Sequence, residues 1–246
     1  MDHSKNNIKL LVSPKNLQEA KTTISAGVDF LDCKNPVEGS LGANFPWIIK
    51  QMKKIIPKNN ETKLSAAIGD FPYLPGTASL AALGAAASGA DIIKVGLKGP
   101  KNEQEGIALM EKVVKAVKQH DPTKLVVAAG YADYSRMDSS PEFLSIPSIA
   151  AKSNADIAML DTYIKDNKNL FDFLDIKQLK KFNNKAKKYN LQVALAGRLS
   201  LDDIEPIKEI SPDLIGVRSV VCEGFNRDEG TIKRDLILDL KQKLKN

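Results

Sequence analysis

Two lysines in this chain lie inside short apolar segments, where a charged side chain is costly. Lys34 ends the segment 30–34, and Lys94 lies within the segment 92–97. Partial burial lowers the pKa of a lysine, and so does a second ammonium group close by. The neutral amine that results can attack a carbonyl carbon and form an imine. The two lysines therefore indicate Schiff-base chemistry.

Two aspartates could assist such a lysine. Asp32 lies two positions before Lys34, so strand alternation turns both side chains to one face and Cys33 to the other. If Cys33 faces outward, Asp32 and Lys34 face the interior. Asp161 ends the apolar segment 157–162. A carboxylate beside an iminium can hold an ammonium or relay protons, which suits carbon–carbon bond formation or dehydration.

These residues belong to a regular alternation of apolar and helical segments. The apolar segments are 9–13, 30–34, 64–69, 92–97, 125–130, 157–162, 192–197 and 214–219. Helical periodicity is clear over 102–120 and 176–190 and from residue 231 onward. Strands that are each followed by a helix form right-handed parallel units, and eight units close into a barrel. The sequence predicts one α/β domain over 1–246, a (βα)8 TIM barrel with residues 1–7 as a polar tail. An open doubly wound sheet is the structural alternative.

A barrel would bring the polar residues together. Active-site groups of such barrels lie at the carboxyl ends of the strands, and alternate strands share a layer of interior side chains. Lys34, Lys94, Asp161 and Arg218 come from the second, fourth, sixth and eighth segments. Each could singly be a salt-bridged residue at the barrel mouth. Four polar residues at corresponding positions favour a common site, because structural cores prefer branched apolar residues there.

Other chemistries fit the sequence less well. His3 lies in the tail and His120 at the end of a helix, which excludes a histidine-based triad. Cys33 and Cys222 match neither a disulfide framework nor a zinc-binding pattern. Metal catalysis is weakened but not removed, and no metal or cofactor is predicted. The carboxylates that could serve a metal are Asp32, Asp70, Asp133 and Asp161.

Net charge and hydropathy limit the classes of partner that this protein can have. The net charge is +6, from 36 lysines and arginines against 30 aspartates and glutamates spread along the chain. No basic stripe is interleaved with aromatic residues, so we expect solvated helix faces rather than a nucleic-acid surface. No apolar run approaches the roughly 20 residues that span a bilayer. We therefore predict a cytoplasmic protein with neither nucleic acid nor membrane as a partner, and a small phosphorylated substrate is compatible with its charge. The oligomeric state stays open, and a homo-oligomer is compatible with the sequence.

The loops after the last two strands are candidates for phosphate binding. Barrels often bind phosphate there, with backbone N–H groups at a glycine and a nearby cation. The residues at these positions are Gly197, Arg198, Arg218 and Ser219. A glycine at such a position can equally end a strand.

Longer motifs carry a family resemblance. They include Asp32-Cys33-Lys34-Asn35-Pro36 and the run 38–47, together with the segments 69–77, 94–97, 128–133, 160–166 and 170–173. Over nearly the whole chain the sequence resembles the (5-formylfuran-3-yl)methyl phosphate synthase family. The resemblance implies a class I aldolase-like lyase. Such a lyase joins two molecules of glyceraldehyde 3-phosphate into 4-(hydroxymethyl)-2-furancarboxaldehyde phosphate, with loss of phosphate and water, on the way to methanofuran.

The resemblance also implies residue roles. It assigns the Schiff base to Lys34, proton transfer to Lys94, and supporting roles to Asp32, Asp161 and Lys165. Lys165 enters by the resemblance alone. The chain departs from the family pattern where phosphate would bind, with an arginine after the glycine at 197 and the run Ser-Val-Val-Cys at 219–222.

Two other classes of function compete with this one. A phosphosugar isomerase or epimerase would use the same barrel without a covalent intermediate, and another class I aldolase would use the same lysine. A non-catalytic barrel that binds a phosphorylated ligand is the further alternative. Trapping with borohydride separates the imine-forming enzymes from the others.

Overall fold

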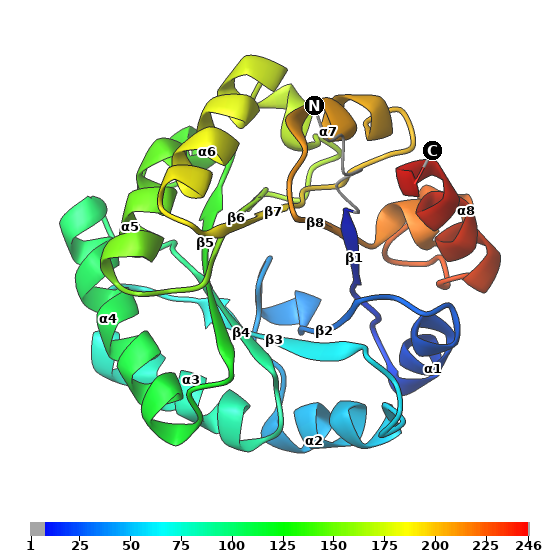
Figure 1. The fold of residues 1–246 in the computed structure, drawn as a ribbon, viewed down its shortest axis with the longest axis horizontal. Helices are drawn as coiled ribbons and strands as arrows, with labels where there is room; N and C mark the ends of the chain where they lie inside the picture. The colour runs from blue at the N-terminus through cyan, green and yellow to red at the C-terminus, as the bar shows by residue number, and fades with distance from the viewer. Residues whose placement is uncertain (1–7, 246) are drawn as a thin grey trace.

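Eight parallel strands close into one barrel, as the sequence predicts (Figure 1). The computed structural model describes residues 8–245, so the expected tail at 1–7 lies outside the described residues. Neighbouring strands pair in sequence order, and β1 closes the barrel on β8. The strands are β1 Lys9–Val12, β2 Phe30–Cys33, β3 Lys63–Asp70, β4 Ile92–Gly96, β5 Leu125–Tyr131, β6 Ile157–Asp161, β7 Gln192–Leu195 and β8 Leu214–Val217.

Helices form a ring outside the strands (Figure 1). Several begin at a residue whose side chain accepts a hydrogen bond from a backbone N–H three positions on, as Asn16, Asn102 and Asp175 do. The α-helices are α1 Leu17–Ser25, α2 Pro46–Ile55, α3 Pro75–Ala87, α4 Glu103–His120, α5 Ile146–Lys152, α6 Ile176–Lys188, α7 Ile204–Ile210 and α8 Arg234–Lys245. The short 3-10 helices are η1 Pro36–Glu38, η2 Tyr134–Arg136, η3 Phe143–Ser145, η4 Leu170–Asp172, η5 Ser219–Val221 and η6 Glu223–Phe225.

Strand alternation divides the core into two parts. Leu31 and Cys33 pack with helix residues in the layer between barrel and helices, whereas Phe30 packs inside the barrel. Cys33 therefore faces the helices, which is the condition under which Asp32 faces the barrel interior. Burial raises the pKa of its thiol to about 12, so Cys33 stays protonated at neutral pH.

Several strands end earlier than the apolar segments predict. β2 ends at Cys33, so Lys34 is the first residue of the following loop rather than the last of the strand. β7 ends at Leu195, because Gly197 and Arg198 have φ values of +116° and +50° and turn the chain away. β8 likewise ends at Val217. Lys34, Arg198 and Arg218 therefore lie in the loops just after their strands, whereas Asp32 and Lys94 remain within strands.

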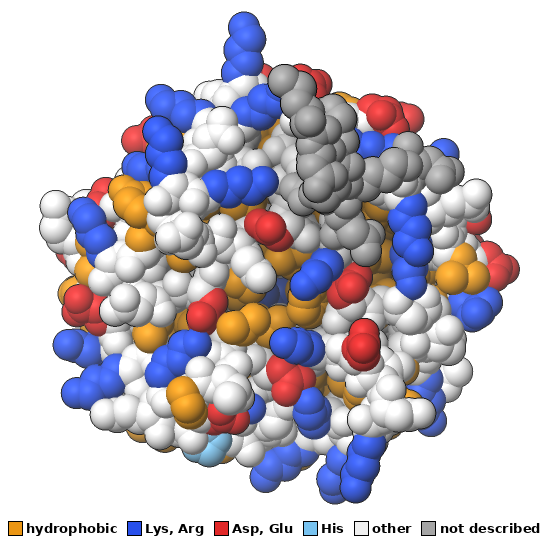
Figure 2. Space-filling view, in the orientation of Figure 1, with side chains coloured by type: hydrophobic (Ala, Val, Ile, Leu, Met, Phe, Trp, Pro, Cys, Tyr) orange, Lys and Arg blue, Asp and Glu red, His pale blue; other side chains and the backbone are white. Residues whose placement is uncertain are grey.

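Charged side chains are dispersed on the face that Figure 2 shows. Lysines and arginines there lie around the rim and alternate with aspartates and glutamates, and they form no single patch on that face. Within residues 8–245, no helix is both long and apolar enough to cross a membrane.

Candidate active site

A buried ion pair lies inside the barrel between two strands that are not neighbours. Lys94 Nζ on β4 is 2.7 Å from Asp32 Oδ1 on β2, and the two side chains are 2% and 0% exposed. Ser13 Oγ, just after β1, donates a hydrogen bond of 2.8 Å to the other oxygen, Asp32 Oδ2. Both charges of the pair are compensated, as burial at this depth requires.

A second ion pair lies at the end of β6. Lys165 Nζ is 3.0 Å from Asp161 Oδ1 and also donates to the carbonyl oxygen of Thr162 at 2.5 Å. Burial raises the pKa of Asp161, but the charges of Lys165 and Lys34 and a hydrogen bond from Lys165 lower it more, to about 2. Asp161 is therefore an anion at neutral pH and faces the lysines as a fixed negative charge.

Lys34 lies between these pairs and has no carboxylate partner within 4 Å in the described part of the chain. Its Nζ donates to the carbonyl oxygen of Ser40 at 3.3 Å. Desolvation is the largest cause that lowers the pKa of Lys34, to about 8, and the charges of Lys165 and Lys94 act in the same direction. Asp161 and Asp32 partly offset them. About a tenth of this lysine is neutral at pH 7, far more than of an ordinary lysine.

The cause of this low pKa differs from the sequence-based expectation in one respect. Lys94 was expected to act as a close second ammonium. In the structure Lys94 is neutralised by Asp32, and its effect on the pKa of Lys34 is smaller than that of Lys165. The depressed pKa is confirmed, but burial rather than Lys94 produces most of it.

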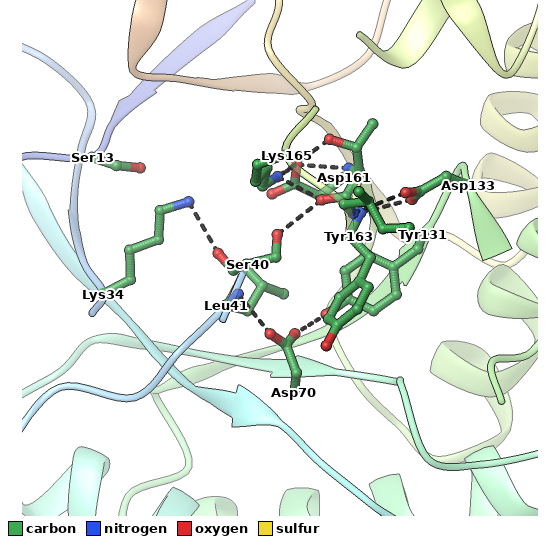
Figure 3. A network of polar contacts seen from close by, with 12 residues as sticks. Ser13, Lys34, Ser40, Leu41, Asp70, Tyr131, Asp133, Asp161, Tyr163 and Lys165 are labelled. Carbon is green, nitrogen blue, oxygen red and sulfur yellow. Dashed lines mark hydrogen bonds and ion pairs between the residues drawn. The ribbon is translucent and has the colours of Figure 1, made fainter. Parts of the chain in front are cut away.

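A short strap, residues 39–41, holds Lys34 in place (Figure 3). The carbonyl of Ser40 accepts from Lys34, while its hydroxyl donates to the carbonyl of Thr162 at 2.9 Å. The backbone N–H of Leu41 donates to Asp70 Oδ2 at 3.2 Å. The Leu41 side chain is fully buried and packs with the barrel interior. The strap therefore ties the loop after β2 to β3 and to the end of β6.

Ser13 and Ser40 were not among the candidate site residues that the sequence indicated. A signal for the strap was present in the two glycines that flank it, Gly39 and Gly42. Gly39 has a φ of +139°, and a Cβ there would lie 2.3 Å from Asp70 Oδ2. A Cβ on Gly42 would lie 2.2 Å from a backbone oxygen. Both positions need glycine because the loop is packed tightly against its neighbours.

Arg218, just past β8, is held by a residue that the sequence did not point to. Its Nη1 is 2.9 Å from Glu19 Oε2 on α1 and donates to the carbonyl of Ser13, while its Nε donates to the carbonyl of Arg227. Burial raises the pKa of Glu19, but the hydrogen bond and charge of Arg218 contribute to a net lowering. Arg218 Nη2 is buried and makes no hydrogen bond within residues 8–245. One nitrogen of the guanidinium thus remains for a ligand.

The loop after β7 lies beside this arginine. Gly197 takes a positive φ, and a Cβ there would lie 3.0 Å from Thr162 Cγ2. Arg198 Nη1 donates to the carbonyl of Asn167 at 2.7 Å, and its guanidinium lies 5.0 Å from the ring centre of Phe225. Gly197 therefore does more than end a strand, because its conformation allows the close approach of two loops.

All nine residues that the sequence singled out line one cavity at the carboxyl ends of the strands, which we call the inner cavity. Its empty volume is about 440 Å³ when the adjoining open solvent is included. The nine are Asp32, Lys34, Lys94, Asp161, Lys165, Gly197, Arg198, Arg218 and Ser219. Two other carboxylates serve the framework instead: Asp133 accepts from two backbone N–H groups of the loop after β6, and Asp70 accepts from Tyr131. Among residues 8–245, no three His, Cys, Asp or Glu side chains meet as metal ligands.

This arrangement can form and process an imine. A partly neutral amine faces a cavity that contains a fixed carboxylate and a second lysine–carboxylate pair, and these can move protons at a carbon next to an iminium. Arginine and backbone donors on the opposite loops can bind a phosphate.

Comparison with known proteins identifies close relatives. The family model described as 4-HFC-P synthase matches residues 10–241. A (5-formylfuran-3-yl)methyl phosphate synthase of Methanococcus aeolicus is 52% identical over 231 residues, which cover 94% of this chain and 97% of the relative. The protein of that name from Methanocaldococcus jannaschii is 52% identical over 233 residues, covering 95% and 98%.

Solved structures share the fold at low sequence identity. A 3-hexulose-6-phosphate synthase superposes with a TM-score of 0.65 at 15% identity and covers 96% of this chain and 99% of its own. The KGPDC from Streptococcus mutans superposes with a TM-score of 0.65 at 13% identity and covers 97% of each chain. These similarities show the barrel alone.

Proposed function

Because this chain belongs to the 4-HFC-P synthase family, we propose that it condenses two molecules of glyceraldehyde 3-phosphate through an imine at Lys34. The observation that carries the proposal is the half-buried Lys34 amine, with a pKa of about 8, in a cavity shared with Asp161 and the Asp32–Lys94 pair. An amine in this state is nucleophilic near neutral pH. The relatives that bear the name (5-formylfuran-3-yl)methyl phosphate synthase support the same product.

The overall reaction balances without a redox partner. Two triose phosphates lose one phosphate and two waters and leave a six-carbon furan aldehyde with one phosphate. Lys34 attacks the carbonyl carbon of the first triose and a water leaves as the imine forms. A proton is then removed from the carbon next to the iminium, and the resulting enamine supplies the nucleophile for the second triose. Elimination of phosphate and cyclisation with loss of two waters follow. Hydrolysis then releases the product from Lys34 and consumes one water, which balances the water lost when the imine formed.

The two ion pairs divide the proton transfers. Lys94 is the proton acceptor. As an ammonium it has no lone pair, so it accepts a proton only after its own proton has passed to Asp32, its partner at 2.7 Å. Asp161 is ionised and stabilises the positive charge of the iminium, while Lys165 holds Asp161 and can protonate a leaving oxygen. The two ion pairs support this division of roles.

The loops after β7 and β8 bind phosphate in this proposal. Arg218 lines the inner cavity, and its Nη2 is buried without a hydrogen-bond partner in residues 8–245. The backbone at Gly197 and Ser219 and the side chain of Arg198 line the same wall. A buried guanidinium nitrogen that lacks an acceptor is well suited to a phosphate oxygen.

Incubation with glyceraldehyde 3-phosphate tests the proposal directly. We expect a new furan-aldehyde absorbance and one released phosphate for each product. Borohydride added with the substrate should attach one triose-derived mass to Lys34. Lys34→Arg should abolish both adduct and product, since guanidinium keeps the charge but forms no imine.

Each other outcome points to a different function. Isomerised triose phosphate without an adduct would indicate an isomerase or epimerase. An aldol product without the furan would indicate a different class I aldolase. Binding of the triose phosphate without turnover would indicate a non-catalytic barrel. An adduct on Lys94 or Lys165 would reject Lys34 as the nucleophile.

A further inference from the structure

A second cavity adjoins the inner one on the side of the β7 and β8 loops, and we call it the outer cavity. Its empty volume is about 880 Å³ when the adjoining open solvent is included. The two cavities share four lining residues, which are Lys165, Arg198, Ser219 and Arg227. The outer cavity adds Lys168 on one side and Asp228 on the other. A ligand in the outer cavity would therefore reach the inner one past a common rim.

The outer cavity has an excess of positive charge. Its lining has two lysines and two arginines against one carboxylate, Asp228. In the described part of the chain, Lys168 and Arg198 have no carboxylate within 4 Å. Lys168 lies over the ring of Phe173 and Arg198 over that of Phe225, at 5.8 and 5.0 Å from the ring centres. Both cations are thus positioned by aromatic rings without being neutralised.

The loop that carries Arg227 is tied to the inner site. Arg218 Nε, which belongs to the inner cavity, donates to the backbone carbonyl of Arg227 at 2.8 Å. Asn226 Oδ1 accepts from the backbone N–H groups of Asp228 and Glu229, at 3.0 and 3.1 Å. These hydrogen bonds connect the β8 side of the outer cavity to the guanidinium in the inner cavity.

Two phosphates exceed what the inner cavity can neutralise. Each phosphate monoester carries about −1.5 to −2 charges at neutral pH. In the inner cavity, Lys94 and Lys165 are paired with carboxylates, Lys34 must be neutral to react, and Arg218 already compensates Glu19. A second dianion deep in this cavity would be poorly compensated. The cations without a carboxylate partner in the described residues are Arg198, on the rim that the two cavities share, and Lys168, in the outer cavity.

We propose that the outer cavity binds the phosphate of the second triose phosphate while the first is held as an imine at Lys34. This inference rests on the proposed function. Lys168 and Arg198 are the principal phosphate ligands, and Arg227 closes the site from the β8 loop. The shared rim allows the carbonyl end of the second triose to extend into the inner cavity toward the bound enamine.

Glycerol 3-phosphate is the probe, because it carries a phosphate but has no carbonyl to react. Enzyme that has been reduced with borohydride in the presence of triose phosphate carries one triose phosphate on Lys34. Calorimetric titration of this reduced enzyme should find one equivalent of glycerol 3-phosphate bound. Lys168→Ala and Arg198→Ala should each weaken that binding about tenfold, as expected for loss of one charge-assisted hydrogen bond. Lys181→Ala, on the exposed face of α6, removes the same charge elsewhere and is the matched control.

The proposed phosphate site in the outer cavity would be refuted if the reduced enzyme did not bind glycerol 3-phosphate. It would also be refuted if the two variants and the control bound it with equal affinity. If no adduct forms at Lys34, the proposed function fails by itself. In that case the untreated enzyme is titrated with glycerol 3-phosphate. Binding of two equivalents, one of which is weakened in the Lys168→Ala variant, would support the phosphate site in the outer cavity. A single equivalent that is insensitive to Lys168→Ala overturns it.

Discussion

The negative charge of Asp161 raises the pKa of Lys34 and the positive charge of Lys165 lowers it. Removing either charge should therefore shift the pH dependence of imine formation, in opposite directions. With a pKa of about 8, about a tenth of Lys34 is neutral at pH 7, against about 0.03% at the ordinary value of 10.5. Imine formation should therefore rise with pH and level off above about 8. The depressed pKa accelerates the reaction at pH 7 about 300-fold through the fraction of neutral amine alone.

Substitutions of Asp161 and Lys165 should change the pKa of Lys34. Asp161 has a pKa of about 2, so Asp161→Asn removes a full negative charge at every assay pH and lets the pKa of Lys34 fall below about 8. Lys165→Met removes a positive charge and raises that pKa. At pH 7 the gain in neutral amine from Asp161→Asn is bounded at about tenfold, because a tenth is neutral already.

Borohydride trapping over a pH series measures these midpoints. The rate at which one triose-derived mass appears on Lys34 is followed by intact-protein mass spectrometry for each variant. Lys181→Met on the exposed face of α6 should leave the midpoint at about 8. Shifts of the same sign in Asp161→Asn and Lys165→Met, or a midpoint near 10.5 in the parent protein, would refute the electrostatic account.

Three further predictions concern the framework of the site. Lys34→Met should raise the free energy of unfolding by about 3 kcal/mol at pH 7, because it removes an ammonium that the fold disfavours. Since the folded pKa of Lys34 is lowered, the penalty is full below about pH 8 and disappears by pH 10.5, so urea titrations of parent and variant should converge at high pH. Lys94→Met should cost about 3–5 kcal/mol by leaving Asp32 buried and unpaired, and should stop turnover while an imine at Lys34 still forms. Retention of turnover would remove Lys94 from proton transfer. Ser40→Ala should cost about 1 kcal/mol and slow imine formation without moving its pH midpoint, because the strap loses its bond to Thr162. Ser40→Thr should restore the rate, and an unaffected rate in Ser40→Ala would make the strap purely structural.

The barrel could be read from the sequence because its elements are local. Eight apolar segments that alternate with helical periodicity allow few topologies, and the helices start at residues whose side chains cap them. Strand alternation over three residues was enough to place Asp32 inside and Cys33 outside. The same regularity brought the nine candidate residues to one cavity, since the carboxyl ends of all eight strands meet there.

The tertiary structure decided which charged side chains form ion pairs within that cavity. The sequence suggested that Lys94 would act on Lys34, yet Lys94 reaches Asp32 across the barrel. Arg218 appeared free for phosphate, yet it binds Glu19, which is 199 positions away in the chain. Long side chains can select among several partners within a few ångströms, and spacing along the sequence does not fix those distances.

The sequence by itself determined the fold, the family and the residue types of the site. The tertiary structure alone decided the pKa of Lys34 and the position of its amine. Ser40, which holds that amine, is anchored to Thr162 at 122 positions' distance, in a loop that no periodicity describes. The pKa depends on how much water the surrounding segments exclude and on the net effect of four charges on three strands or their following loops. Both are properties of packing between distant segments, and they exist once the barrel has closed.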